Sequence, residues 1–391
     1  MEKYARLLSR NDLAPYLSTE QFQFRESVNR ALDANATPDY LRKCDEEKVF
    51  PKKLVDLAGE QGWFAVALPE EYGGIGGPMD MIGLLEILGY HSISLARYWN
   101  INVNMVGGAI VRLGTAAQKQ KLLPSLAEAK TFFAFALSEN ASGSDAASLK
   151  TSARLEGEHF VDNGTKMWIT GPLQADYILT ACRTEKGEGK HEGISLLLIP
   201  RDTPGVTVTP IDLLGGHMVR TCEINLVDAR VSRDWMVGDL HKGWSQLLGV
   251  LSKERIALSA MCVGAAQAAL DQALEYAKER KQFGRAIASF QVINHKLVEM
   301  QTMIDASRLL TFRGARMLER GLPCNVESAQ AKFFASDSYM QVAIEGLQIM
   351  GANGYSMEYS MQRHFREAKV FQIFGGTNEI LRNVVAREML S

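Results

Sequence analysis

The spacing of apolar residues changes twice along this 391-residue chain, and this change limits the folds that it can adopt. Up to about residue 131, and again from about 241, apolar residues recur with the period of a helix. Between about 132 and 235 they alternate with the period of a strand. The sequence therefore predicts an α+β protein with an N-terminal α-helical domain (1–131), a middle β-domain (132–240) and a C-terminal α-helical bundle (241–391).

Caps and helix formers locate the helices of the first third. Ser18–Gln21 has the pattern of a capping box, and Pro51 can occupy the first position of a further helix. Leu68–Gly77 is rich in glycine but has no strand–loop–helix setting, so we expect a plain loop there rather than a phosphate loop. Further helices are expected near 80–90, 102–113 and 116–128.

The last third is expected to form long helices over Gly243–Arg280, Phe290–Arg320 and Val326–Met350. The first of them is rich in alanine and glycine, so neighbouring helices can approach it closely. Their length and short connections predict an up-and-down bundle.

The middle segment carries a hairpin signal at Asn163-Gly164, because this dipeptide supplies the positive φ angles of a type I′ turn. We expect strands on both sides of it. Further strands are expected over Phe132–Leu137, Gly193–Ile199, Val206–Pro210 and Cys222–Val231.

The composition is that of a soluble globular protein, with 46% hydrophobic and 23% charged residues and a net charge of −2. This near-neutral balance argues against nucleic acid as the main partner. The five cysteines are scattered without C-x-x-C spacing, which favours reduced thiols in a cytoplasmic compartment and no metal site. We find neither a signal peptide nor a run of 18 apolar residues, so no membrane association is expected.

The stretch Val370–Ile380 ends an apolar run at Gly375-Gly376 and then opens an amphipathic segment. Two glycines let the backbone approach a ligand closely, and N–H groups at the start of a helix favour anions or developing oxyanions. A simple helix–loop–helix junction with Thr377 or Asn378 as N-cap explains the same pattern.

Two segments of the β-domain have the composition of a cofactor site. Ser138–Asp145 joins hydroxyl groups and a glycine in one loop, which suits a phosphate or a flavin edge as well as a surface turn. In Lys166–Gly171, Trp168 and Thr170 stand two apart on one strand face. This pair could pack against a planar ring, although a half-buried core tryptophan is an equally simple explanation.

Charged residues mark two places in the C-terminal segment. Glu279–Arg285 ends a helix with cations, which already favours the helix dipole, and Arg280 could also reach a phosphate. Lys253–Arg255 lies among apolar neighbours. A partly buried glutamate beside an arginine is a candidate general base, whereas a solvated helix face is the usual alternative.

Six motifs in this order and spacing resemble the acyl-CoA dehydrogenase family over nearly the whole chain, although each is weak alone. They are L-P-E-E-Y-G-G, L-S-E-N-A-S-G-S-D, K-M-W-I-T, R-K-Q-F-G-R-A-I, Q-I-M-G-A-N-G-Y and F-G-G-T-N-E-I. The resemblance implies an N-terminal α-domain, a middle β-domain and a C-terminal four-helix bundle, which agrees with the changes of period.

The resemblance implies FAD as the cofactor and assigns residues to it. Those expected to line its isoalloxazine are Phe135, Leu137, Ser138, Ser144, Trp168 and Thr170. Those expected to reach the FAD of a neighbouring subunit are Arg280, Gln282 and Phe283, and those that complete the site are Gln348, Gly351, Ala352, Thr377 and Glu379. A shared cofactor implies a homodimer or a homotetramer.

The family reaction is α,β-desaturation of an acyl thioester, in which a carboxylate takes the α-proton and the β-hydrogen leaves as hydride to flavin N5. By resemblance, the main-chain N–H of Gly375 donates to the thioester oxygen. Many members carry the catalytic glutamate in the motif Tyr-Glu-Gly-Thr, but this chain has Phe374-Gly375-Gly376-Thr377. A minority place the base on a bundle helix, and Glu254 matches that position. Arg255, Ser144 and Phe374 are expected to contact the substrate.

Several functions stay open at this point. The substrate is an acyl-CoA, or an acyl or aminoacyl group on a carrier protein, and the asparagines of Tyr98–Met105 hint at a polar or short acyl group. Exposure to solvent or capping of helices would explain these asparagines equally well. Electron-transfer flavoprotein is the expected acceptor. The alternatives are a relative that has lost dehydrogenation, namely a desulfinase, an oxygenase that uses O2, or a flavin-binding scaffold.

Overall fold

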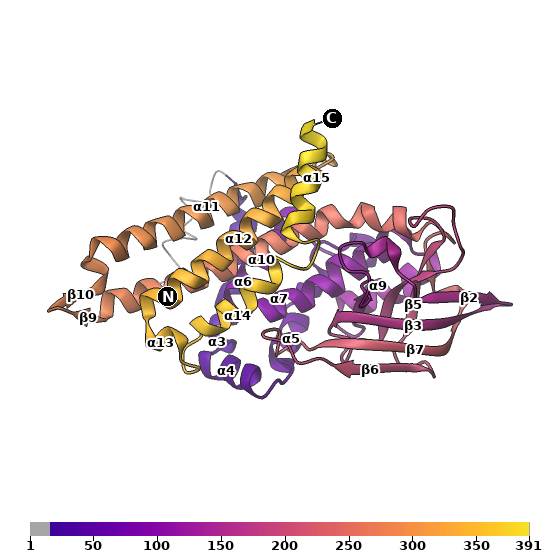
Figure 1. Cartoon of the computed structure of the whole chain (residues 1–391), viewed down its shortest axis with the longest axis horizontal. Helices are drawn as coiled ribbons and strands as arrows, with labels where there is room; N and C mark the ends of the chain where they lie inside the picture. Colours follow the sequence, from indigo (N-terminus) through magenta and orange to yellow (C-terminus); the bar gives the residue numbers. More distant parts are fainter. Residues whose placement is uncertain (1–15, 391) are drawn as a thin grey trace. The chain divides into compact units, whose positions relative to one another are not determined.

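The computed structural model describes residues 16–390 and shows helical segments before and after a β-rich segment (Figure 1). The helices are α3 (Thr19–Asn35), α4 (Pro38–Glu46), α5 (Lys52–Glu60), η1 (Trp63–Ala65), η2 (Glu70–Tyr72), α6 (Pro78–His91), α7 (Ile93–Trp99), η3 (Asn100–Gly107), α8 (Gly108–Leu113), α9 (Ala116–Ala127), η4 (Ala146–Ser148), η5 (Arg233–Trp235), α10 (Gly243–Glu279), η6 (Ile287–Ser289), α11 (Gln291–Glu319), α12 (Asn325–Met350), α13 (Ala352–Tyr355), α14 (Met361–Phe371) and α15 (Asn378–Leu390). The predicted order of helices, strands and helices is confirmed.

Contacts divide the chain into two compact units. The helical unit holds the described residues up to Lys43, together with Gly77–Ala96 and the chain from Arg255 onward. The β unit holds Cys44–Gly76 and Arg97–Glu254. The N-terminal segment thus contributes to both units, and the bounds of the three predicted domains stay a prediction.

The helical unit is built on α10 from Arg255 onward and on the long helices α11 and α12, which run side by side (Figure 1). Helix α6 packs against α10 where a glycine removes the side chain. A Cβ atom on Gly264 would lie 1.8 Å from the carbonyl oxygen of Glu86, and one on Gly89 would lie 2.5 Å from that of Met261. The glycines of α10 and α6 are therefore required for this approach, as the composition of the long helix predicted.

The β unit contains a mainly antiparallel sheet in the order β6-β7-β3-β2-β4-β5-β8, with β1 parallel to β4. Its core gathers apolar side chains from several strands, among them Phe160, Ile178 and Ile224. The strands are β1 (Phe133–Ala136), β2 (Ser152–Glu156), β3 (His159–Thr170), β4 (Tyr177–Arg183), β5 (Ile194–Pro200), β6 (Val206–Pro210), β7 (Thr221–Ser232) and β8 (Met236–Val237).

The predicted hairpin turn at Asn163-Gly164 is wrong, because β3 continues through both residues to Thr170. The turn lies earlier, at Gly157-Glu158, where Glu156 pairs with His159. The pairing of β3 with β7 shifts register between Asp162 and Gly164, and Gly164 has a φ of 149°. The glycine thus serves a β-bulge rather than a turn, and its missing side chain leaves room for Thr151, 2.6 Å from an added Cβ.

Local helix signals were read correctly in most places. Ser18 caps α3 through a capping box with Gln21, as predicted. Pro51 is the N-cap residue of α5 rather than its first helical residue. The predicted helix over 102–113 is present, but its first part, η3, is a π-helix.

The five cysteines are free, buried thiols. Within residues 16–390, no helix is both long enough and apolar enough to cross a membrane.

Candidate functional site

The loop between α14 and α15 has a strongly turned backbone. Gly375 and Gly376 both have positive φ angles, 66° and 83°, which glycine adopts without steric cost. Thr377 caps α15, because its hydroxyl accepts the N–H of Ile380 at 3.2 Å. The predicted junction is thus present, and its cap is Thr377 rather than Asn378. The side chain of Asn378 is instead buried and bonded to Lys332 and Ser336.

Glu254 and Arg255 lie on α10 and are both buried, with exposed fractions of 5% and 8%. Arg255 donates through Nη1 to the side chain of Asn325 at 2.8 Å. The alternative of a solvated helix face is therefore wrong for this pair. This burial is compatible with the predicted role of Glu254 as a general base, which stays a prediction.

Trp168 and Thr170 lie at the end of β3, where a second bulge interrupts the pairing with β7 between Lys166 and Ile169. The indole of Trp168 is 51% exposed, and its backbone has a φ of 65°. Thr170 accepts a hydrogen bond from Arg97 Nη2 at 3.2 Å. The sequence reasoning missed Arg97, although a charge inside the apolar helix α7 was a signal for it.

The residues after β1 lie beside this part of β3. Met167 N–H donates to the carbonyl of Ser138 at 2.9 Å, and Lys166 Nζ donates to that of Leu137 at 3.0 Å. The structure thus brings Leu137 and Ser138 next to the strand that carries Trp168. Phe135 is half-buried on β1, and Ser144 is exposed in the following loop.

A short hairpin follows α10, formed by β9 (Lys281–Gln282) and β10 (Arg285–Ala286). It projects beyond the ends of α10 and α11 (Figure 1). Phe283 at its tip is 93% exposed and has a φ of 53°, and Arg280 and Gln282 are also exposed. An apolar ring left in water at a strained position is poorly explained by the fold of this chain alone.

The remaining predicted cofactor residues lie at two helix ends. Gly351 ends α12 with a φ of 60°, and Gln348 and Ala352 beside it are exposed. Glu379 is exposed in the first turn of α15, where its own backbone N–H and the hydroxyl of Thr377 lower its carboxyl pKa.

The asparagines of η3 do not support the hint of a polar acyl pocket. All three are buried and bonded internally. Asn102 donates to the carbonyl of Tyr98 and accepts the N–H of Phe133, and Asn104 donates to the side chain of Asn100. Both alternatives, solvent exposure and helix capping, are also excluded for Asn102, which ties η3 to β1.

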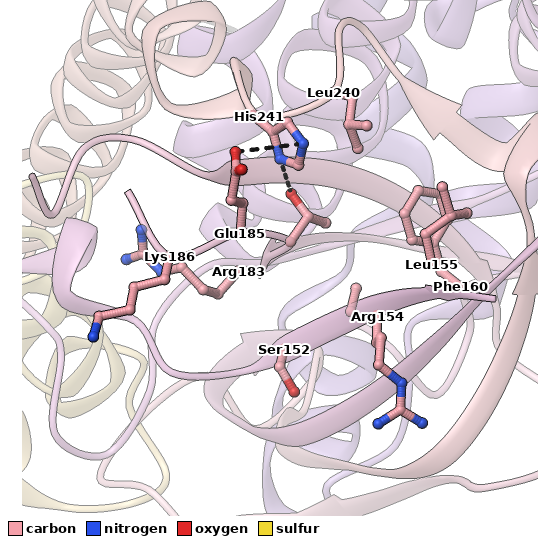
Figure 2. A pocket seen from close by; sticks show the side chains of 11 residues that line it. Ser152, Arg154, Leu155, Phe160, Arg183, Glu185, Lys186, Leu240 and His241 are labelled. Carbon is pink, nitrogen blue, oxygen red and sulfur yellow. Dashed lines mark hydrogen bonds and ion pairs between the residues drawn. The ribbon is translucent and has the colours of Figure 1, made fainter. Parts of the chain in front are cut away.

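A hollow of about 490 Å³ opens on the β unit, and Figure 2 shows its lining. Several of its polar side chains bond to neighbours. Arg183 donates to the carbonyls of Ala147 and Lys190, and His241 lies 2.9 Å from the hydroxyl of Thr184. The lining contains none of the predicted site residues, so this hollow is not the candidate site.

The residues of the β unit fit a planar cofactor in two respects. The exposed indole of Trp168 offers an apolar face, and the neighbouring backbone at Leu137 and Ser138 is fixed by hydrogen bonds. The hydroxyl groups of Ser138, Ser144 and Thr170 are of a kind that can bond the polar edge of a flavin ring, and their role there stays a prediction.

Comparison with known proteins identifies the family. The descriptions "Acyl-CoA dehydrogenase, N-terminal domain", "middle domain" and "C-terminal domain" match residues 18–130, 134–229 and 241–390. A probable acyl-CoA dehydrogenase of Bacillus subtilis, YngJ, is 38% identical over 376 residues, which are 96% of this chain and 99% of that protein.

Solved structures agree. Butyryl-CoA dehydrogenase from Megasphaera elsdenii is 33% identical, with a TM-score of 0.92, over 96% of this chain and 99% of the other. The prolyl acyl carrier protein oxidase AnaB is 29% identical, with a TM-score of 0.91, over 95% and 99%. Family members are FAD-dependent oxidoreductases that act on CH–CH bonds and are typically tetramers. On these matches, which span all three of its segments, the chain belongs to the acyl-CoA dehydrogenase family.

Proposed function

We propose that this enzyme desaturates an acyl thioester between its α and β carbons and that Glu254 is the base. The position of the available carboxylates supports this proposal. The loop Phe374–Thr377 has none, whereas Glu254 is buried on α10 at the position that a minority of the family uses.

Removing an α-proton requires stabilisation of the charge that develops on the thioester oxygen. We assign this role to the main-chain N–H of Gly375, in a loop whose two positive φ angles only glycine adopts easily. Arg255, Ser144 and Phe374 would contact the substrate around it. FAD, when bound, supplies the acceptor for the β-hydride.

The cofactor residues follow the same proposal. Phe135, Leu137, Ser138, Ser144, Trp168 and Thr170 would hold the flavin ring of one subunit. The exposed hairpin with Arg280, Gln282 and Phe283 would reach the FAD of a partner subunit. The residues that would complete the dinucleotide site are Gln348, Gly351, Ala352, Thr377 and Glu379. Coverage by a second copy of the chain would explain why Phe283 is 93% exposed in one copy.

The decisive experiment replaces Glu254 with glutamine and follows flavin bleaching under anaerobic conditions. We expect the bleaching rate with a reactive acyl-CoA to fall about a thousandfold, because general-base catalysis contributes on this order. FAD content and affinity should not change. Glu275→Gln, on the same helix, is the matched control and should bleach at the wild-type rate. A Glu254→Gln enzyme that bleaches normally would refute the assignment of the base.

A carrier-bound substrate is a second candidate, favoured by the similarity to an oxidase of a prolyl carrier protein. A panel that presents the same acyl or prolyl group on CoA and on a carrier protein separates the two. Faster bleaching by the carrier thioester would favour this candidate. Comparing the rates at which electron-transfer flavoprotein and O2 reoxidise the reduced flavin would then identify the electron acceptor.

A further inference from the structure

Two lysines in the described chain are fully buried, Lys166 in the β unit and Lys332 in the helical unit, each with 0% exposure. Burying an ammonium group is costly unless it is paired and hydrogen-bonded. The groups that pair with these two side chains therefore indicate which parts of the chain each lysine holds in place. In both cases they include a main-chain carbonyl of a predicted site segment.

Lys166 holds the segment that follows β1. Its Nζ donates to the carbonyl of Leu137 at 3.0 Å and to Oε1 of Glu139 at 2.9 Å. The carboxylate of Glu139 also accepts the N–H groups of Lys150 at 2.7 Å and Thr151 at 2.8 Å. Burial raises the pKa of Glu139, but these hydrogen bonds and the charge of Lys166 lower it on balance. One buried ion pair thus fixes the backbone on either side of the loop 140–149.

The same lysine stands at the bulge that presents Trp168. On β3, Lys166 pairs with Ile224 and Ile169 pairs with Cys222, so β3 has one residue more than β7 between these pairs. Trp168 has a left-handed φ of 65°, a conformation that costs about 1–2 kcal/mol for a residue with a side chain. The bonds of Lys166 and Met167 to the segment Leu137–Ser138 occur directly before it and hold the bulge in place.

Lys332 holds the glycine loop. Its Nζ donates to the carbonyl of Gly376 at 2.8 Å and to Oδ1 of Asn378 at 3.1 Å. Asn378 in turn donates to Ser336 Oγ at 2.9 Å and to Asp337 Oδ1 at 2.7 Å. Two consecutive glycines have wide conformational freedom, so Gly375 keeps a fixed N–H direction only if the loop is restrained from outside.

We propose that Lys166 and Lys332 are positioning residues, one for each backbone segment of the site. Lys166 fixes the Leu137–Ser138 backbone and the Trp168 bulge against which the flavin ring lies. Lys332 fixes the loop whose Gly375 N–H polarises the thioester carbonyl. This inference rests on the proposed function for the roles of those segments, and it adds the two groups that hold them.

The test compares Lys166→Met and Lys332→Met as FAD-loaded enzymes, with two readouts other than turnover. The first is the dissociation constant of FAD together with the visible circular dichroism of the bound flavin. The second is the red shift of para-dimethylaminocinnamoyl-CoA on binding, which reports polarisation of its carbonyl. We expect Lys166→Met to weaken FAD binding about tenfold, as for one lost charge-assisted hydrogen bond, and to change the flavin spectrum.

Lys332→Met should give the complementary pattern. The red shift of the thioester probe should fall by half or more. FAD affinity should fall by less than in Lys166→Met, because the residues of the β unit that would hold the flavin ring keep their contacts. If Lys166→Met leaves FAD binding and the flavin spectrum as in the wild type, Lys166 has only a structural role. If Lys332→Met leaves the red shift of the probe as in the wild type, the same is true of Lys332. The same holds if both variants lose both readouts in step with their melting temperatures.

If a methionine variant does not fold, the glutamine variants Lys166→Gln and Lys332→Gln retain one donor and should show intermediate shifts of the same readouts. Wild-type readouts at these positions would overturn the proposal equally. Failure of the proposed function looks different. Wild-type enzyme would then bind FAD but neither polarise the thioester probe nor bleach with any thioester, while the effect of Lys166→Met on FAD would remain.

Discussion

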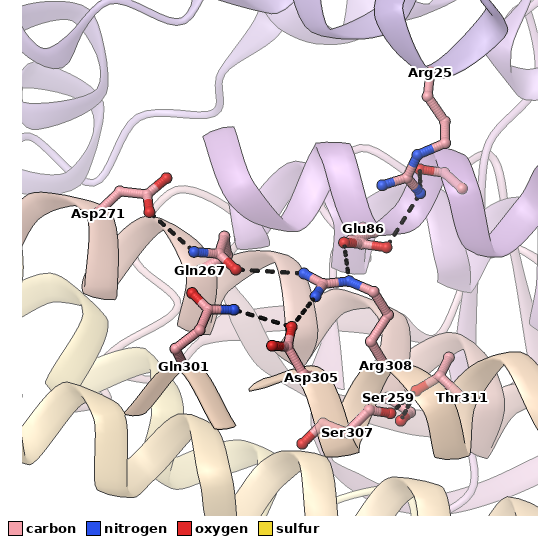
Figure 3. Close-up of polar contacts among 11 residues, drawn as sticks. Arg25, Glu86, Ser259, Gln267, Asp271, Gln301, Asp305, Ser307, Arg308 and Thr311 are labelled. Atoms are coloured by element: carbon pink, nitrogen blue, oxygen red, sulfur yellow. Dashed lines mark hydrogen bonds and ion pairs between the residues drawn. The ribbon is translucent and has the colours of Figure 1, made fainter. Parts of the chain in front are cut away.

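Both units bury ionic clusters, but the clusters join different kinds of group. In the helical unit Glu86 accepts from Arg25 Nη1 at 3.1 Å and from Arg308 Nε at 3.0 Å, so that one carboxylate joins α3, α6 and α11 (Figure 3). In the β unit Lys166 donates to Glu139 and to a main-chain carbonyl. The first cluster connects side chains of different helices, whereas the second fixes backbone.

Because of this difference, the first cluster should matter for the stability of the fold and the second for the geometry of the predicted cofactor site. Burial raises the pKa of Glu86, but the charges of Arg25 and Arg308 outweigh it and keep the carboxyl ionised. No predicted site residue takes part in these contacts of Glu86. The bonds of Lys166 go directly to Leu137, a predicted flavin neighbour. We therefore expect changes in the first cluster to affect unfolding, and changes in the second to affect the cofactor.

The largest effect is expected for Glu86→Gln, which removes the carboxylate that two buried guanidinium groups share, although Arg308 keeps its bond to Asp305. The free energy of unfolding should fall by about 3–5 kcal/mol near neutral pH, measured by urea denaturation. The folded-state pKa of Glu86 lies below its usual 4.5, so this contribution is present above that value and is lost as the pH falls through the folded pKa.

The visible circular dichroism of bound FAD should be unchanged in Glu86→Gln. A changed flavin spectrum would contradict the expectation that this cluster affects unfolding but not the cofactor. As a control, the triple variant Arg25→Met, Glu86→Leu, Arg308→Met removes all three charges together. It should lie within about 2 kcal/mol of wild type, because apolar replacement of a buried ion cluster is often neutral.

A smaller, pH-dependent effect is expected for Asp162→Asn in the β unit. Asp162 is buried on β3, and burial raises its carboxyl pKa from 3.8 to about 7, against a weak bond from the Cys182 thiol. Because the folded pKa is the higher one, the protonated carboxyl stabilises the fold fully below about pH 4, and this contribution is lost as the pH rises through 7.

Asparagine does not titrate, so the two proteins should be similarly stable near pH 4. Above about pH 7 the variant should be more stable by about 2–4 kcal/mol, since each unit of pKa shift is worth about 1.4 kcal/mol. Thermal unfolding at a series of pH values measures this difference. A difference that is constant with pH would mean that Asp162 does not titrate in the folded protein.

Much of the fold followed from periodicity, because helix and strand periods depend only on neighbouring residues. The long helices α10, α11 and α12 were predicted within a few residues of their ends. The hairpin at Asn163-Gly164 failed because the same dipeptide also suits a bulge, and the choice depends on Thr151, which is distant in sequence.

In the candidate site, too, local sequence patterns revealed some residues and not others. Gly375, Trp168 and Glu254 stand in motifs that can be read along the chain. Lys166 and Lys332 donate to carbonyls at distant positions, Leu137 and Gly376. Lys166 stands in the K-M-W-I-T motif, but no local pattern shows that either side chain bonds to remote backbone. Arg97 donates to Thr170 across 73 positions, and the charge inside the apolar helix α7 marked Arg97 as unusual without indicating that distant partner.

The smallest effect is expected for Asp271→Asn, the counterpart of Asp162 in the helical unit. Asp271 is also largely buried, and burial raises its carboxyl pKa to about 6, but two neighbours donate to it. Tyr90 O–H lies 3.0 Å from Oδ2, and Gln267 Nε2 lies 2.9 Å from Oδ1. These bonds favour the charged form and explain why its pKa is raised less than that of Asp162.

The stabilising contribution of protonated Asp271 should therefore be lost between about pH 4 and 6, a narrower range than for Asp162. Over that pH range the free energy of unfolding of the asparagine variant should rise by about 1–2 kcal/mol relative to the wild type. It should rise no further above about pH 6. Thermal unfolding at the same series of pH values as for Asp162→Asn measures both. If Asp271→Asn gained more than Asp162→Asn, hydrogen-bond donors would not be what distinguishes the buried carboxyls of the two units.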